Sequence, residues 1–365
     1  MSRISVSPFL VSLLVLFVAT LVADVPAQGR GRNGIKKGEW KSKKDVPEGW
    51  IVYRTRRYTF QSNAPLDRVK RVAAHLKAAY KLYEKKFPSG RTPKRPFVVK
   101  IFKNRPEFIA YGAPPSAGAY YSWRDKEMVG YDTGKIDGEV KSAGVTGKPK
   151  GLRERIRRLR ANRAMDLLGV FAHEGWHQYF HFTCASKVEF PSWCDEGIGE
   201  YFYSMRYRQK KYLTGDPNDY RLGTIQRHIK AGTFIPLKDL VTFNQRKYYS
   251  DASKAYAQGW ALVHFFLEHP KYKKKRYLQR FVKTFIAQHS IDKAVKTVFS
   301  SMDWPTVTDD WKAWVMAMKV PGKAGDDDAD AAEARRKALE RLGGGLFGGE
   351  KPPGGGEKKK DPKKD

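Results

Sequence analysis

One short segment holds three of the eight histidines of this 365-residue chain. It reads DLLGVFAHEGWHQYFHF and spans residues 166–182. His173 and His177 are four residues apart, so on a helix they project from the same face, one turn apart. Two such imidazoles can bind one Zn²⁺, and Glu174 beside them can deprotonate a water at the open coordination position. The spacing predicts a metal-binding helix with a general base; the alternative is a polar interruption of an aromatic helix.

A third ligand separates these two interpretations. Where it follows closely, as H-E-x-x-H-x-x-G-x-x-H, glycine is needed at position 180 and histidine at position 183. The chain has Phe180 and Thr183 there, which excludes that pattern. In the other known pattern a glutamate on the next helix completes the site, and FPSWCDEGIGEYF supplies Glu196, with eighteen residues between it and His177. One turn later, Glu200 can accept the remaining N–H of a ligand histidine. These residues together predict one Zn²⁺ per chain.

The two metal-binding segments resemble those of the glutamate-zincins (gluzincins), which are metallopeptidases. Their pattern is H-E-x-x-H, an eighteen-residue gap, and a W-x-x-E-G-x-x-E-Y helix, present here from Trp193 to Tyr201. The chain is also similar to a set of exported, largely uncharacterised peptidase-like proteins. These share a Y-A-Q-x-W-A-L-V-H-F helix, found here from Tyr256 to Phe265. The resemblance covers residues 50–320 and implies a zincin-like α+β fold.

The resemblance also implies roles for individual residues. The metal ligands would be His173, His177 and Glu196, with Glu174 as the catalytic base and Glu200 as the residue that orients a ligand histidine. The implied activity is hydrolysis of peptide bonds in a peptide or protein substrate. The G-x-M-E-N signature with which aminopeptidase relatives grip a free amino terminus is missing, and the nearest text is DKEMVGYD at residues 125–132. We therefore expect an endopeptidase.

A tyrosine is the expected donor to the oxyanion. In the aminopeptidase relatives this tyrosine is followed by a glycine three positions later, and Tyr256 and Gly259 match. Tyr248 and Tyr249 are competitors for the role, and the alternative is that Tyr256 is an ordinary aromatic residue at a helix start. We also expect an extended substrate to pair with the strand at Met128–Tyr131, which precedes the metal-binding helix.

The elements that position these residues form an α+β chain. A small mixed α/β N-terminal part is predicted at residues 49–150, with strands near residues 50–60 and 96–102, a helix at 66–87 and a hairpin at 117–134. A mainly helical zinc-binding part is predicted at residues 151–320. Two further segments lack periodicity: a flexible basic lead-in at 28–48 and a disordered tail rich in Gly, Lys and Asp at 321–365.

The amino terminus has the features of a secretory signal peptide, assigned to residues 1–27. An uncharged apolar run from Phe9 to Val22 precedes the small residues Val25 and Ala27, and the run is short for a membrane-spanning helix. The prediction is export to a secreted or periplasmic location, with no transmembrane segment after cleavage; the alternative is an uncleaved anchor. In such a compartment Cys184 and Cys194 can form a disulfide, and the alternative is two buried thiols.

The chain is strongly basic, with 70 Lys and Arg against 38 Asp and Glu and a net charge of +32. Such a field attracts polyanions, including anionic polymers of the cell envelope, although it also suits a soluble secreted protein. No recognisable motif for specific nucleic-acid binding is present. The sequence is consistent with two functions. The first is an exported zinc endopeptidase, and the alternative is a polyanion-binding cell-envelope protein whose zinc site is structural or inactive.

Overall fold

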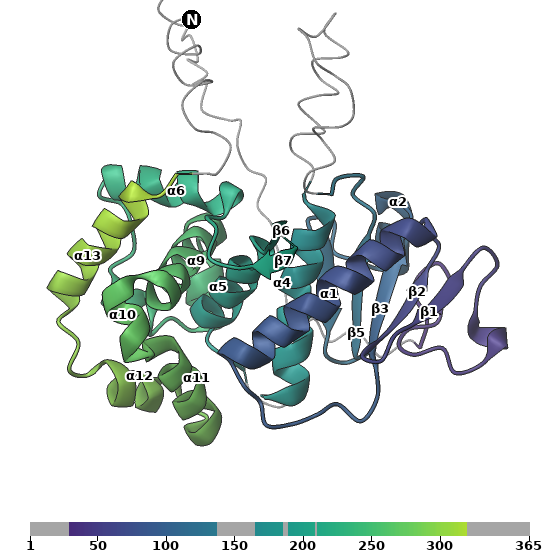
Figure 1. Ribbon diagram of the computed structural model, residues 1–365, viewed down its shortest axis with the longest axis horizontal. Coiled ribbons are helices and arrows are strands. Elements are labelled where there is room, and N and C mark those ends of the chain that lie inside the picture. Colours follow the sequence, from purple (N-terminus) through teal and green to yellow (C-terminus); the bar gives the residue numbers. More distant parts are fainter. Residues whose placement is uncertain (1–28, 137–164, 185–188, 209, 320–365) are drawn as a thin grey trace, which may run out of the picture. The chain divides into compact units, whose positions relative to one another are not determined.

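A computed structural model describes residues 29–136, 165–184, 189–208 and 210–319 (Figure 1). The chain divides into two units, Met1–Met318 and Lys319–Asp365, and all elements named below belong to the first. The predicted signal peptide (1–27) and the predicted disordered tail (321–365) lie outside the described residues.

A five-stranded sheet forms the N-terminal part. Its strands are β1 (Ile51–Arg54), β2 (Tyr58–Ser62), β3 (Phe97–Phe102), β4 (Ala119–Ser122) and β5 (Glu127–Tyr131). They lie in the order β1-β2-β3-β5-β4. The pairs β2–β3 and β3–β5 are parallel, whereas β1–β2 and β4–β5 are antiparallel. Every residue of β2 and β3 is buried, as expected for interior strands of β-branched and aromatic composition.

Helices make up most of the chain outside the sheet. The helices are α1 (Leu66–Lys86), α2 (Arg105–Tyr111), α4 (Leu167–Thr183), α5 (Ser192–Tyr203), α6 (Asp219–Lys230), α7 (Leu237–Leu240), α8 (Gln245–Tyr249), α9 (Ala252–Glu268), α10 (Pro270–Lys275), α11 (Tyr277–Gln288), α12 (Ile291–Phe299) and α13 (Trp304–Ala317). A two-stranded ribbon, β6 (Arg206–Arg208) and β7 (Lys211–Leu213), comes after α5. The predicted mixed α/β class, with a sheet region before a mainly helical part, is confirmed. No helix in the described part is long and apolar enough to cross a membrane.

Helix α4 joins the sheet to the helical part. It packs against α1, β4 and β5 on one side and against α5 on the other. The hydroxyl of Tyr83 on α1 donates to the carbonyl of Ala172 at 2.5 Å, and the Gln178 amide donates to the carbonyl of Val98 on β3 at 3.0 Å. Both bonds are buried, so they fix the rotation and height of α4 against the sheet.

The strand at the edge of the sheet beside α4 is β4. Strand β5 has β3 on one side and β4 on the other, so its backbone groups are already paired. The expectation that a substrate pairs with Met128–Tyr131 is therefore wrong. Among the described strands β4 has only β5 as a neighbour, so its outer edge has no strand partner, although the backbone of Tyr121 there hydrogen-bonds the Glu174 carboxylate.

The basic segment 28–48 differs from the flexible lead-in that its composition predicts. The side chain of Trp40 is only 1% exposed. The backbone N–H of Gly38 donates to Glu127 on β5 at 2.8 Å, and Lys100 on β3 donates to the carbonyl of Gly38 at 2.6 Å. A buried aromatic side chain and a buried ion pair thus hold part of this segment against the sheet.

Candidate metal centre

The candidate site is built on α4 and α5, which lie side by side. Asp166 caps α4, and its carboxylate accepts the backbone N–H groups of Leu168 and Gly169 at 3.3 and 3.2 Å. Close approach of the two helices depends on Gly199 of α5. A Cβ atom at that position would lie 2.8 Å from the imidazole of His173, so any larger residue would push the ring aside.

The structure brings the three predicted ligands together. The Nε2 atom of His173 lies 3.1 Å from Nε2 of His177 and 3.2 Å from Oε2 of Glu196. The Nε2 atom of His177 lies 3.5 Å from the same carboxylate oxygen. Ligand atoms about 2.1 Å from a tetrahedral zinc ion are about 3.4 Å apart, so these separations fit one ion. All three side chains are buried, and together they could hold a metal.

Two carboxylates support the ligand histidines from behind. Asp195 contacts Nδ1 of His177 at 3.1 Å and accepts the indole N–H of Trp176 at 2.9 Å. Burial alone would lower the pKa of His177, but the carboxylates of Asp195 and Glu196 raise that pKa well above its usual value. The predicted partner Glu200 lies 3.7 Å from Nδ1 of His173, which is an ion-pair distance rather than a hydrogen bond.

Glu200 is itself held by two side chains from the segment that enters α6. The guanidinium of Arg221 donates to Glu200 at 2.5 Å, and the amide of Asn218 donates to it at 2.7 Å. Asn218, Arg221 and Asp195 are not among the site residues predicted from the sequence. The position of Asp195 directly before a ligand glutamate is the one signal that could have identified it. Nothing in the sequence connects the α6 residues to the site.

A substitution of Asp195 tests whether this carboxylate orients the ligand His177. We expect Asp195→Asn to weaken zinc binding about 10- to 100-fold, because the amide cannot accept from His177 as strongly as a carboxylate does. The dissociation constant would be measured by competition with a chromophoric chelator. Asp309→Asn is a matched control, since that side chain is 79% exposed, and it should leave the affinity unchanged. Equal affinity of both variants and the parent would show that Asp195 does not orient His177.

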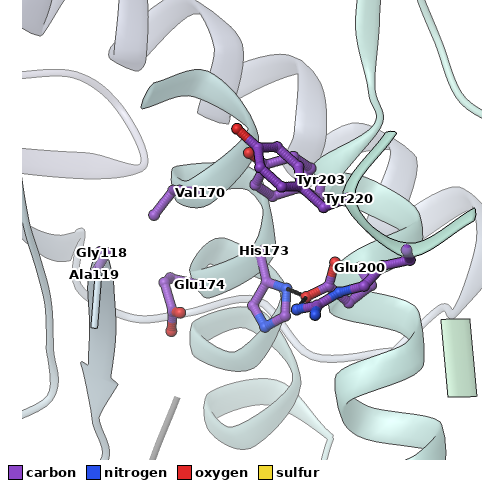
Figure 2. Close-up of a pocket in the computed structure, with 9 residues that line it drawn as sticks. Gly118, Ala119, Val170, His173, Glu174, Glu200, Tyr203 and Tyr220 are labelled. Carbon is purple, nitrogen blue, oxygen red and sulfur yellow. Dashed lines mark hydrogen bonds and ion pairs between the residues drawn. The ribbon is translucent and has the colours of Figure 1, made fainter. Parts of the chain in front are cut away.

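Glu174 lies beside the ligands and lines a small cavity with Gly118, Ala119, Val170 and His173 (Figure 2). The cavity measures about 10 Å³, which is about the room that one water molecule needs. Glu174 is 2% exposed, and its Oε2 atom has no hydrogen-bond partner among the described residues. Burial raises the pKa of Glu174 above its usual value. A buried carboxylate oxygen without a partner, on a residue that lines room for one water, is suited to accept a proton.

The tyrosine nearest the ligand set is Tyr249. Its hydroxyl donates to Oε1 of Glu196 at 2.7 Å. Tyr256 is 1% exposed, and its ring packs 6.1 Å from that of Tyr249 and 4.9 Å from the guanidinium of Arg221. Tyr256 therefore lies one side chain farther from Glu196 than Tyr249 does. The role of Tyr256 as the oxyanion donor stays a prediction. The hydrogen bond from Tyr249 to Glu196 favours Tyr249 as the competitor for that role.

The predicted disulfide is absent, since Cys184 and Cys194 are both free thiols. Cys194 lies within α5 and is fully buried. Cys184 comes directly after the last residue of α4, and its sulfur lies 3.5 Å from the hydroxyl of Thr183. The two thiols thus occupy different environments, one inside the helical core and one at a helix end.

Residues 168–285 match the model of a family described as a protein of unknown function (DUF1570). The matched stretch contains the three candidate ligands together with Glu174 and Tyr256. No curated protein matches the chain. The family description assigns no activity to these residues.

Proposed function

We propose that the protein is an exported zinc-dependent metallopeptidase of the gluzincin type that cleaves internal peptide bonds. The observation that carries the proposal is the position of Glu174. Its Oε2 atom has no hydrogen-bond partner among the described residues, and Glu174 lines a water-sized cavity together with His173, one of the three converging ligands. A purely structural zinc site needs no base at that place, whereas hydrolysis does.

Each residue of the site has a separate task in this reaction. His173, His177 and Glu196 hold the zinc ion, which supplies a Lewis acid and lowers the pKa of a water toward about 7. Glu174 accepts a proton from a water molecule at Oε2 and returns it to the nitrogen of the leaving amine. The hydroxyl of Tyr249 or Tyr256 donates to the oxygen that becomes negatively charged.

Substrate orientation comes from the sheet. The open edge of β4 passes the candidate site, and Ala119 at its start lines the same cavity as Glu174. An extended peptide added to this edge would place a carbonyl carbon near the water that Glu174 activates. Pairing along a strand needs no free chain end, which agrees with internal cleavage.

The second candidate, a polyanion-binding cell-envelope protein with a structural or inactive zinc site, is favoured by a different observation. The cavity beside Glu174 holds little more than one water, and the three ligand residues are each at most 5% exposed. A substrate therefore needs some displacement of the walls before it can reach the site.

One experiment separates the two. The zinc content of the purified full chain and its cleavage of a mixed peptide library would be measured before and after treatment with a chelator. We expect about one zinc per chain and cleavage within peptides that stops when the metal is removed. Zinc without cleavage would favour the second candidate. A chain that binds no zinc would contradict both.

A further inference from the structure

A second cavity, far larger than the one beside Glu174, lies at the other end of α4. It measures about 480 Å³ and is bounded by the end of α1, the loop after α1, the end of α4 and one face of α11. Cys184 lines it, seven residues beyond His177, which corresponds to about 10 Å along the helix axis. We call this cavity the cationic pocket. Its basic lining residues are Lys86, Arg91, Arg276 and Lys283.

The charge of the cationic pocket is not balanced. No Asp or Glu is among its lining residues. Lys86 has a partner in Glu268 at 3.4 Å, but Arg91, Arg276 and Lys283 form no ion pair with any residue in the described ranges. Like charges gathered around one cavity repel each other and create a positive potential inside it. A bound anion would remove this repulsion.

The backbone at Arg276 adds to the positive potential. Arg276 links α10 to α11 with φ 52° and ψ 35°, a left-handed conformation that glycine adopts at lower cost. No side chain caps the N–H groups in the first turn of α11, so the positive end of that helix dipole is unscreened there. A strained arginine thus stands at the uncapped end of a helix, in a wall of the pocket.

Part of the remaining lining is apolar, whereas Ser89, Thr183 and Gln279 add polar groups to it. Its apolar surface is formed by Pro88, which is exposed, and Ile286, which is partly exposed, over the buried side chains of Phe87 and Val282. A free inorganic anion would leave this surface uncovered. A ligand that combines one anionic group with a hydrocarbon portion would contact both parts of the pocket, and the volume lies in the range of small-molecule sites.

We propose that the cationic pocket binds a small amphiphilic anion, whose phosphate or carboxylate group lies among Arg91, Arg276 and Lys283 and whose hydrocarbon portion packs on Pro88 and Ile286. This site is separate from the metal centre, and the inference does not depend on the proposed peptidase activity.

Cys184 provides a local probe of occupancy. The chain has two cysteines, and Cys194 is fully buried, so a neutral reagent such as iodoacetamide should modify Cys184 first. Monobutyl phosphate and hexanoate would be titrated into the full chain, with inorganic phosphate and butylammonium as comparison ligands. Affinity would be measured by calorimetry, and the rate of Cys184 alkylation by mass spectrometry. Binding at the metal centre would not protect this thiol.

We expect at least one amphiphilic anion to slow alkylation about tenfold when its concentration is about ten times its Kd. Inorganic phosphate should bind about tenfold more weakly than butyl phosphate, because it buries no hydrocarbon. Whichever of butyl phosphate and hexanoate binds tighter identifies the head group. Butylammonium should not protect the thiol.

Arg276→Gly is the most informative variant, because it removes a charge while it relieves the left-handed strain. It should lower the affinity at least about tenfold and leave the Tm equal or higher. Lys283→Gln should also weaken binding, whereas Lys274→Gln, an exposed position outside the pocket, should not. Equal weakening by Lys274→Gln, equal protection by butylammonium, or no protection by either anion would overturn the proposal. A Cys184 that does not react at all would also overturn it, since the pocket would then be closed.

Discussion

Replacing Glu174 by glutamine is expected to lower kcat for peptide cleavage about a thousandfold, within the 10²- to 10⁴-fold range of general acid–base catalysis. The amide has the shape of the carboxylate but cannot accept a proton from water. The substitution should fold normally, because the lost oxygen makes no hydrogen bond to any described residue. Zinc content should stay at the parent value, since Glu174 is not among the ligand-forming groups. The measurements are steady-state kinetics on a cleaved library peptide and metal analysis of the same sample.

Glu189→Gln is the matched control, because this glutamate is exposed and lies just before α5. It should retain the parent rate. If Glu174→Gln kept more than about a tenth of the activity, Glu174 could not be the general base. A loss of both zinc and activity would instead show that Glu174 supports the metal site, and the proposed division of roles would have to change.

Much of this metal centre could be predicted from the sequence, because the spacing of its ligands along the chain is short and regular. The spacing of His173, His177 and Glu196 depends only on helical periodicity and on one short connection, and these residues do converge. The remaining contacts come from distant segments. Tyr249 reaches Glu196 across 53 residues of sequence, and Arg221 reaches Glu200 across 21. Such contacts are set by how α6 and α8 pack, which periodicity does not encode.

In the sheet, too, local patterns were predictable from the sequence and pairings between distant segments were not. The hairpin at 117–134 was predictable from two strand-like runs around a turn, and it forms as β4 and β5. The sequence did not predict which of the two strands lies inside the sheet. That position is decided by the parallel pairing of β5 with β3, which lies about thirty residues earlier in the chain. The parallel pairing places β5 inside and β4 at the edge, and this reverses the strand expected to meet a substrate.

The basic segment 28–48 is ordered against the sheet although its composition predicts flexibility. Composition measures average hydrophobicity, whereas here one side chain and one ion pair decide the outcome. Trp40 is buried with the ammonium of Lys100 5.2 Å from its ring centroid. Lys100 pairs with Glu127 at 2.5 Å, and both side chains are fully buried. Glu127 also accepts from Tyr111 at 2.6 Å, so one carboxylate connects the segment to three parts of the sheet region.

Glu127→Ala is therefore expected to lower the free energy of unfolding by about 3–5 kcal/mol. The variant leaves the Lys100 ammonium buried without a counter-charge, and the Gly38 N–H and the Tyr111 hydroxyl lose their acceptor as well. Burial already lowers the pKa of Lys100, and loss of the opposing carboxylate would lower that pKa further. The measurement is chemical denaturation at neutral pH, together with the rate of trypsin cleavage within 36–44, which should rise.

The double variant Lys100→Leu with Glu127→Leu separates the ion pair from simple loss of volume. Because it removes both charges and keeps the site filled, it should be less destabilised than Glu127→Ala, even though Gly38 still loses two partners. Asp309→Ala, which breaks an exposed pair with Lys312, should cost no more than about 1 kcal/mol. If Glu127→Ala cost as little as that surface variant, the pair would not be buried, and the segment would be held by Trp40 alone. A large loss of unfolding free energy together with rapid trypsin cleavage would mean that the carboxylate of Glu127 determines whether segment 28–48 stays folded on the sheet. This carboxylate lies on β5, the strand next to β4 at the metal centre.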